Sequence, residues 1–280
     1  MQTSFKEILQ DAFQRQYAVG AFNCLSVENV LGAIQAAEEL RSPIILELAE
    51  VQFPYAPLEK MIPVFLEAAC NASVPVAVHL DHGQSFQTCA RAIRSGCQSV
   101  MIDGSLLFLE ENIRLTRAVT QMANAFGVNV EAELGQVGDA SVEGSGTADV
   151  FTNVEEAVRF VDQTGIDALA IAIGNLHGKY VATPKLNIQR LKEIKQRIQL
   201  SLVLHGGTGT SDEDFKDCIH NGICKINVAT AIQIGVTEKI RQYMATSATP
   251  NYIEMKYKMT EASKEVVAKH LLLFESNNKV

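Results

Sequence analysis

Short apolar runs alternate with longer amphipathic stretches along almost the whole chain. Eight runs rich in Val, Ile, Leu and Ala predict strands at residues 17–23, 43–49, 75–81, 99–104, 129–134, 168–173, 201–206 and 223–230. Their largely continuous apolar character is typical of strands buried on both faces of a parallel sheet. Between them, stretches such as residues 26–42 repeat apolar positions three and four apart, with Ser26 placed to cap a helix. The pattern predicts eight successive strand–helix units.

Eight such units predict an α/β fold, a (β/α)8 TIM barrel, rather than an open doubly wound sheet. No GxGxxG motif opens the first predicted helix, and no second domain is visible. The rhythm stops near residue 245, and residues 251–275 predict one or two extra helices that pack outside the barrel or against a partner chain. We therefore expect one domain over residues 1–280, with the barrel at about 1–245 and a helical extension at about 246–280.

Composition narrows the class of protein. Hydrophobic residues make up 47% and charged residues 20%, a balance typical of a folded globular chain. No apolar run approaches the roughly 20 residues that cross a bilayer, and residues 1–13 predict an amphipathic helix rather than a signal peptide. The net charge of -8 offers no basic face for nucleic acid. Six cysteines without CxxC spacing indicate reduced thiols, so we expect a cytoplasmic protein with no membrane or nucleic-acid partner.

Three histidines follow the ends of three predicted strands. His82 follows Asp81 in HLDHG, His177 lies in GNLHG and His205 lies in LHGGTG. Because barrel active sites lie at the carboxyl ends of the strands, three imidazoles are expected at one mouth. Catalytic zinc takes three protein ligands and keeps a fourth position open. The pattern indicates a zinc site, whereas His79, inside its strand, is expected to be a core residue.

Glycine-rich turns follow the same strands. Gly178 comes after His177, GGTG follows the seventh strand at residues 206–209, and the eighth strand ends at residues 227–230 before a helix. Glycine lets backbone N–H groups approach an anion, and barrels often bind phosphate after strands seven and eight. We expect a substrate phosphate here, although a tight turn explains GGTG alone equally well.

Carboxylates complete the candidate chemistry. Asp103 ends the fourth predicted strand, and Glu131 and Glu133 lie on one side of the fifth. Asp103 and Glu133 are expected either to act directly or to orient metal ligands through hydrogen bonds. The following segment, residues 135–153, is rich in Gly, Ser, Asp and Ala and predicts a mobile lid.

Seven motifs occur in order over about residues 1–245: AFN, HLDHG, SVMIDGS, VEAELGQVG, AIAIGNLHG, LVLHGGTG and GICKINVAT. Through them the chain resembles the class II, metal-dependent ketose-bisphosphate aldolases, which include the fructose- and tagatose-bisphosphate aldolases. VEAELGQ and KINVAT look closest to the tagatose-type subgroup.

The resemblance implies a zinc-dependent aldolase that reversibly cleaves a ketose phosphate or ketose 1,6-bisphosphate into dihydroxyacetone phosphate and an aldehyde. It implies that His82, His177 and His205 bind Zn²⁺, that Glu133 is an alternative metal ligand and that Asp81 is the acid/base at the C4 hydroxyl. A monovalent cation, Na⁺ or K⁺, often assists in the family, and a homodimer or homotetramer is expected. The implied substrate-binding residues are Asn23, Gly178, Gly206, Gly207, Thr208, Asn227, Val228, Ala229 and Thr230.

Three positions depart from the family pattern. The lid acid that exchanges the C3 proton aligns near Ser141, which leaves Glu143 as the candidate. At the end of the second strand, where the family commonly has a hydroxyl residue, this sequence has Ala49. The Pro-Arg pair before the C-terminal helix, whose Arg reaches the second phosphate of a neighbouring subunit, is replaced by Pro250 and Asn251. Loss of this bidentate phosphate donor predicts an aldehyde without a terminal phosphate. Lys256 and Lys258 could replace the missing Arg, although charged residues on a helix usually form its solvated face.

Three alternatives stay open on sequence alone. A metal-dependent sugar-phosphate epimerase or isomerase on the same barrel needs similar residues, but its reaction leaves the carbon count unchanged. A Schiff-base aldolase would use Lys225 on the eighth strand. A non-catalytic aldolase-like subunit would keep its partners after loss of the three histidines.

Overall fold

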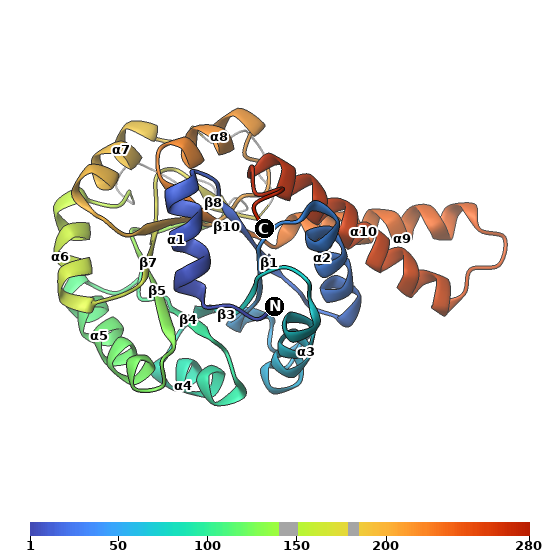
Figure 1. Cartoon of the computed structure of the whole chain (residues 1–280), viewed down its shortest axis with the longest axis horizontal. Helices are drawn as coiled ribbons and strands as arrows, with labels where there is room; N and C mark the ends of the chain where they lie inside the picture. The colour runs from blue at the N-terminus through green and yellow to red at the C-terminus, as the bar shows by residue number, and fades with distance from the viewer. Residues whose placement is uncertain (140–150, 179–184) are drawn as a thin grey trace.

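Eight parallel strands close into a barrel in a computed structural model that describes residues 1–139, 151–178 and 185–280 (Figure 1). Around the barrel the order is β1-β10-β9-β7-β5-β4-β3-β2. All eight lie within the predicted runs or extend them by two residues at most, which confirms the (β/α)8 prediction. The bounds are β1 Val19–Asn23, β2 Ile44–Ala49, β3 Val76–Gly83, β4 Ser99–Ile102, β5 Asn129–Leu134, β7 Ala168–Ile171, β9 Ser201–Leu204 and β10 Ile223–Val228.

Helices cover the outside of the barrel, and the largest hydrophobic core lies between them and the strands (Figure 1). The first of them, α2, begins as its sequence predicts, because Ser26 Oγ accepts a hydrogen bond from the Asn29 backbone N–H at 3.4 Å. Within the described residues, no helix is long and apolar enough to cross a membrane. The bounds are α2 Val27–Leu40, η1 Glu50–Gln52, α3 Leu58–Asn71, α4 Phe86–Ser95, α5 Leu109–Ala125, α6 Val154–Thr164, α7 Ile188–Arg197 and α8 Asp212–His220.

The amino-terminal helix α1 (Phe5–Arg15) covers the end of the barrel where the strands begin (Figure 1). Its buried face, which includes Phe5 and Leu9, packs with inward-facing strand residues such as Ala21 and Met101. The Phe5 ring stacks on the imidazole of His79, which is fully buried as predicted. This apolar layer seals one end of the barrel and leaves the polar carboxyl ends of the strands to form the mouth at the other.

Two helices follow the last strand and project from the barrel as a hairpin (Figure 1). Helix α9 (Thr230–Thr246) leads outward, and α10 (Tyr252–Leu273) returns across α2. The crossing is close because position 32 is Gly: a Cβ there would lie 2.5 Å from the Thr260 carbonyl oxygen. Behind α10 the chain rejoins the barrel, where the Phe274 carbonyl accepts a hydrogen bond from the Ala18 N–H at 3.1 Å.

A second, two-stranded parallel sheet lies outside the barrel and is absent from the sequence prediction. It pairs β6 (Gly138–Asp139) with β8 (Leu176–His177). The pairing brings the segments that follow β5 and β7 side by side. Most of the predicted lid lies outside the described residues, as do Ser141 and Glu143.

Candidate active site

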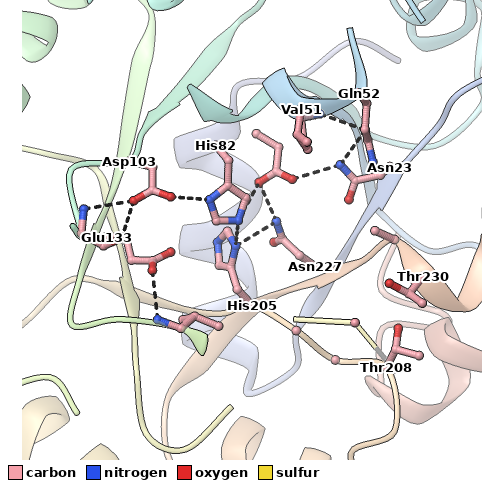
Figure 2. A pocket seen from close by; sticks show the side chains of 18 of the residues that line it. Asn23, Val51, Gln52, His82, Asp103, Glu133, His205, Thr208, Asn227 and Thr230 are labelled. Carbon is pink, nitrogen blue, oxygen red and sulfur yellow. Dashed lines mark hydrogen bonds and ion pairs between the residues drawn. The ribbon is translucent and has the colours of Figure 1, made fainter. Parts of the chain in front are cut away.

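A cavity of about 420 Å³ opens at the carboxyl ends of the barrel strands (Figure 2). Strands from opposite sides of the barrel contribute to it. Of the residues that the sequence analysis singles out as ligands, acid/base or substrate contacts, those that line it are Asn23, Asp81, His82, Glu133, Gly178, His205, Gly206, Gly207, Thr208, Asn227, Ala229 and Thr230.

His82 has an unusual backbone conformation at the end of β3. Its φ is 43°, in the left-handed region, and the β3–β4 register shifts between Leu80 and Gly83. A residue with a Cβ is strained by roughly 1–2 kcal/mol in this region, and such strain concentrates at functional sites. The His82 Nδ1 atom lies 2.8 Å from Asp103 Oδ2, and its Nε2 lies 2.8 Å from His205 Nδ1. Asp103 therefore orients the ring and leaves Nε2 facing His205.

His205 is held from inside the barrel. Its Nε2 lies 2.8 Å from Glu131 Oε1, and Lys225 Nζ lies 3.0 Å from Glu131 Oε2 and 3.5 Å from Glu47 Oε2. The side chains of Glu47, Glu131 and Lys225 are fully buried. The histidine thus takes its orientation from a carboxylate that is itself fixed by a buried cation.

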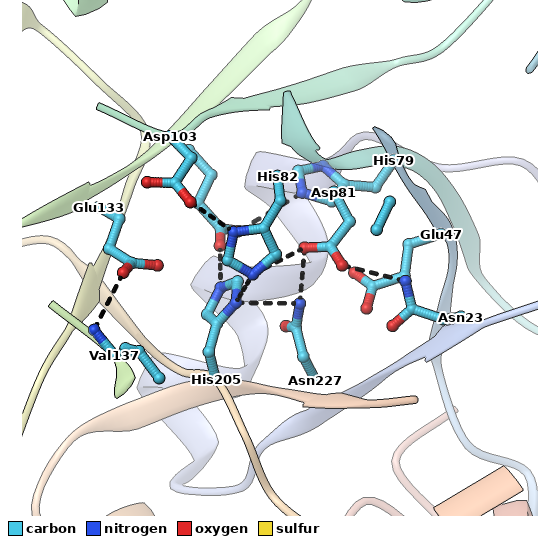
Figure 3. A network of polar contacts seen from close by, with 12 residues as sticks. Asn23, Glu47, His79, Asp81, His82, Asp103, Glu133, Val137, His205 and Asn227 are labelled. Carbon is cyan, nitrogen blue, oxygen red and sulfur yellow. Dashed lines mark hydrogen bonds and ion pairs between the residues drawn. The ribbon is translucent and has the colours of Figure 1, made fainter. Parts of the chain in front are cut away.

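Asp81 lies beside the two imidazoles and is held by two amides. Asn23 Nδ2 donates to its Oδ2 and Asn227 Nδ2 donates to its Oδ1, each at 3.0 Å (Figure 3). Burial raises the pKa of Asp81, but the charges on His82 and His205 outweigh burial and lower this pKa below its ordinary value. The carboxylate is therefore ionised at neutral pH, with its position fixed.

The site favours a positive charge between its acids. Burial lowers the pKa of His82, but the charge on Asp81 and the hydrogen bond to Asp103 outweigh burial and raise this pKa to about 10. Burial and the charge on Asp103 also raise the pKa of Glu133, to about 8. Glu133 Oε2 is buried and has no hydrogen-bond partner among the described residues. A cation bound here would satisfy these groups.

The donor set fits a divalent metal. Ligand atoms of Asp81, His82 and His205 all lie within 4.8 Å of one another, as do those of His82, Asp103 and Glu133. Imidazole and carboxylate are ligands that zinc accepts. The backbone of His177 lies in β8, but its side chain is outside the described part of the chain, so the third histidine ligand stays a prediction.

The expected phosphate segments lie on one side of the cavity. Gly206 has a φ of 74°, a conformation that favours glycine, and begins the turn after β9. Thr208 Oγ1 then accepts a hydrogen bond from the Ala231 N–H at 3.1 Å, which joins this turn to the first turn of α9. Val228 is the exception among the expected contacts: its side chain is fully buried in the hydrophobic core and does not line the cavity.

Several lining residues were not singled out from sequence as substrate contacts. Gln52 Oε1 accepts hydrogen bonds from the Ala49 N–H at 3.1 Å and from Asn23 Nδ2 at 3.5 Å. The others on the same side of the cavity are Val51, Gln84, Ser105 and Leu106. The sequence signal that these residues share is their position, because each follows the carboxyl end of a barrel strand.

Lys225 is poorly suited to act as a Schiff-base nucleophile. Burial lowers its pKa, but Glu131 and Glu47 outweigh burial and raise the pKa above its ordinary value. Its Nζ also donates to Asn227 Oδ1 at 2.6 Å. A lysine nucleophile must lose its proton, which this environment opposes.

The chain is similar to known proteins over nearly its whole length. The family model for class-II fructose-bisphosphate aldolase matches residues 3–279. A probable fructose-bisphosphate aldolase of Bacillus subtilis (strain 168) is 40% identical over 282 residues, covering 99% of this chain and 98% of the relative. The crystal structure of the YdjI aldolase from Escherichia coli K12 is similar with a TM-score of 0.91 and 33% identity, covering 100% of this chain and 99% of that one.

A third similar protein is a putative fructose-1,6-bisphosphate aldolase from Coccidioides immitis. Its structure has a TM-score of 0.88 and 32% identity, and the match covers 98% of this chain and 96% of that one. These names do not distinguish a tagatose-type subgroup, so that part of the sequence interpretation stays a prediction.

Proposed function

Because the chain belongs to the class-II fructose-bisphosphate aldolase family, whose members are metal-dependent enzymes, we propose that it is a zinc-dependent aldolase. Its reaction is the reversible cleavage of a ketose phosphate or ketose 1,6-bisphosphate to dihydroxyacetone phosphate and an aldehyde. The observation that carries the proposal is the position of Asp81, an amide-held carboxylate whose Oδ1 lies 3.9 Å from His82 Nε2. Asp81 thus lies directly beside the candidate metal ligands, where it would act as the general base.

His82, His177 and His205 would hold the zinc, with Glu133 as an alternative ligand. When bound, zinc supplies Lewis-acid chemistry that draws electron density from the ketose carbonyl and its neighbouring hydroxyl. Asp103 and Glu131 keep the His82 and His205 rings oriented through their hydrogen bonds.

The protein residues divide the remaining work. Backbone N–H groups of the turn after β9 and the first turn of α9 hold the phosphate of the dihydroxyacetone phosphate half. During cleavage, Asp81 accepts the proton of the C4 hydroxyl. The C3–C4 bond then breaks, and its electron pair stays with the dihydroxyacetone phosphate half. Asp81 returns the proton to the aldehyde oxygen in the condensation direction. Glu143 is our candidate for the proton at C3.

Two further features belong to the same proposal. Na⁺ or K⁺ near the phosphate would assist binding of the dianion, and the chain would assemble as a homodimer or homotetramer. Sedimentation of the purified protein tests the assembly, and activity in salts of different monovalent cations tests the ion.

Product analysis tests the reaction. The protein is incubated with fructose or tagatose 1,6-bisphosphate and with the corresponding 1-phosphates, and dihydroxyacetone phosphate is followed by a coupled reduction with NADH. We expect its release, loss of the signal with a chelator and recovery with zinc. Conversion of the ketose only to isomers with the same number of carbon atoms would contradict the proposal and favour an epimerase.

A further inference from the structure

The order of strands places two sets of loops on opposite sides of the cavity. Strand β9 and strand β3 are separated by three strands in either direction around the barrel, and the same holds for β10 and β4. The phosphate segments follow β9 and β10. A ketose whose phosphate lies there and whose C4 hydroxyl meets Asp81 must extend its remaining carbons toward the loops after β2, β3 and β4.

That side of the cavity is neutral or apolar where it is not acidic. Among the described residues that line the cavity there is no lysine or arginine. The ionisable residues that line this side are the acids Asp81, Asp103 and Glu133 and the candidate metal ligand His82. A second phosphate dianion is normally bound by cationic donors, and the uncharged lining residues on this side offer only amide, hydroxyl and apolar groups. They are Ala49, Val51, Gln52, Gln84, Ser105 and Leu106.

Two large apolar side chains are left in solvent at this edge. Val51 is 70% exposed and Leu106 is 83% exposed, although both line the cavity. Because both side chains line the cavity, a ligand that fills it can cover them. Gln84 and Ser105 lie next to them and offer an amide and a hydroxyl to the hydroxyl groups of a ligand.

The loops that carry these side chains are held in place by the carboxylates behind them. Glu50 accepts hydrogen bonds from the Gln84 N–H at 2.6 Å and the Thr88 hydroxyl at 2.8 Å. Asp103 Oδ1 accepts from the Ser105 N–H at 3.0 Å and its hydroxyl at 2.7 Å, while Oδ2 orients His82. This edge is therefore ordered before a ligand arrives, which lowers the entropic cost of binding.

We infer that the aldehyde half of the substrate is an uncharged hydroxyaldehyde whose carbon chain lies against Val51 and Leu106. The inference rests on the proposed aldolase function and specifies its second substrate. The lining at this edge is neutral or apolar, so it favours an uncharged aldehyde over a phosphorylated one.

The test compares two aldehydes of equal carbon number in condensation with dihydroxyacetone phosphate. We expect kcat/KM for glyceraldehyde to exceed that for glyceraldehyde 3-phosphate by at least about tenfold. Leu106→Lys introduces a cation at the edge and should move this ratio about tenfold or more toward the phosphorylated aldehyde. Phe108→Lys is the matched control, because Phe108 is 84% exposed in the same loop but does not line the cavity. It should leave the ratio nearly unchanged.

Two results would overturn the inference: preference of the unmodified enzyme for the phosphorylated aldehyde, or an equal shift in both lysine variants. Exchange of the C3 hydrogen of dihydroxyacetone phosphate with solvent separates this failure from failure of the proposed function, because it needs no aldehyde. Exchange with the opposite aldehyde preference refutes the inference alone. Absence of both exchange and condensation in zinc-loaded protein refutes the aldolase function on which it rests.

Discussion

His205 Nε2 and Glu131 Oε1 lie 2.8 Å apart in the closed interior of the barrel, so a candidate metal ligand is fixed by a fully buried carboxylate. Glu131 is in turn 3.0 Å from Lys225 Nζ. These contacts extend the site into the interior of the barrel, through side chains that no substrate can reach. The orientation of His205 depends on this internal ion pair.

Glu131→Gln should weaken metal binding while the fold is retained. Gln has the shape of Glu but lacks its charge, and loss of a carboxylate that orients a metal-binding histidine typically costs about 10- to 100-fold in metal affinity or activity. Zinc titration with a competing chelator measures the effect. Unchanged affinity together with unchanged kcat/KM would show that Glu131 does not position His205.

Lys225→Met should destabilise the barrel. Glu47 and Glu131 would lose the cation that lies between them, and removing one partner from a buried ion pair costs about 3–5 kcal/mol in the free energy of unfolding. Urea denaturation of the zinc-loaded protein measures it. Lys258→Met offers a control, since Lys258 pairs with Glu261 near the surface, where ion pairs contribute roughly 0–1 kcal/mol. Equal effects of the two substitutions would be inconsistent with the buried network.

Asp81→Asn should separate the two halves of the reaction. Loss of a positioned acid/base typically lowers a rate by about 10²- to 10⁴-fold, so cleavage of the ketose should slow to that extent. Exchange at C3 of dihydroxyacetone phosphate should change much less, because this molecule has no C4 hydroxyl. Both rates are measured on protein with matched zinc content. Equal losses in cleavage and exchange would assign Asp81 to another step.

Thr208→Val should weaken phosphate binding without changing the metal site. The substitution keeps the side-chain shape but removes the oxygen that accepts the Ala231 N–H and joins the β9 turn to α9. A hydrogen bond contributes about 0.5–1.5 kcal/mol, which corresponds to an increase of roughly 2- to 10-fold in KM for dihydroxyacetone phosphate. Steady-state condensation kinetics give KM, and an unchanged value would remove this turn from the phosphate site.

The barrel was predictable because strands buried on both faces appear as nearly continuous apolar runs. The β6–β8 sheet was not, since two residues per strand give no periodicity. Val228 illustrates the opposite case: a shared motif suggested a contact, yet its side chain points to the core because it alternates with the inward-facing Asn227.

The candidate site was predictable only in part. Histidines and glycines at strand ends are visible in the sequence because the ends of barrel strands meet at one mouth. The Glu131–Lys225 pair joins residues 94 positions apart, and no local pattern indicates which carboxylate meets which cation. The left-handed backbone conformation of His82 could not be predicted either, because that conformation is usually signalled by a glycine and this position is a histidine.

In the proposed function, Asp81 and the histidines serve a metal-dependent aldolase. The most direct measurement incubates the protein with dihydroxyacetone phosphate in deuterated water and follows the C3 proton signal by NMR, with and without a chelator. We predict stereospecific loss of one C3 proton that stops when the metal is removed and resumes with zinc. Retention of both protons by zinc-loaded protein, in the presence and absence of added aldehyde, would refute the proposed aldolase function.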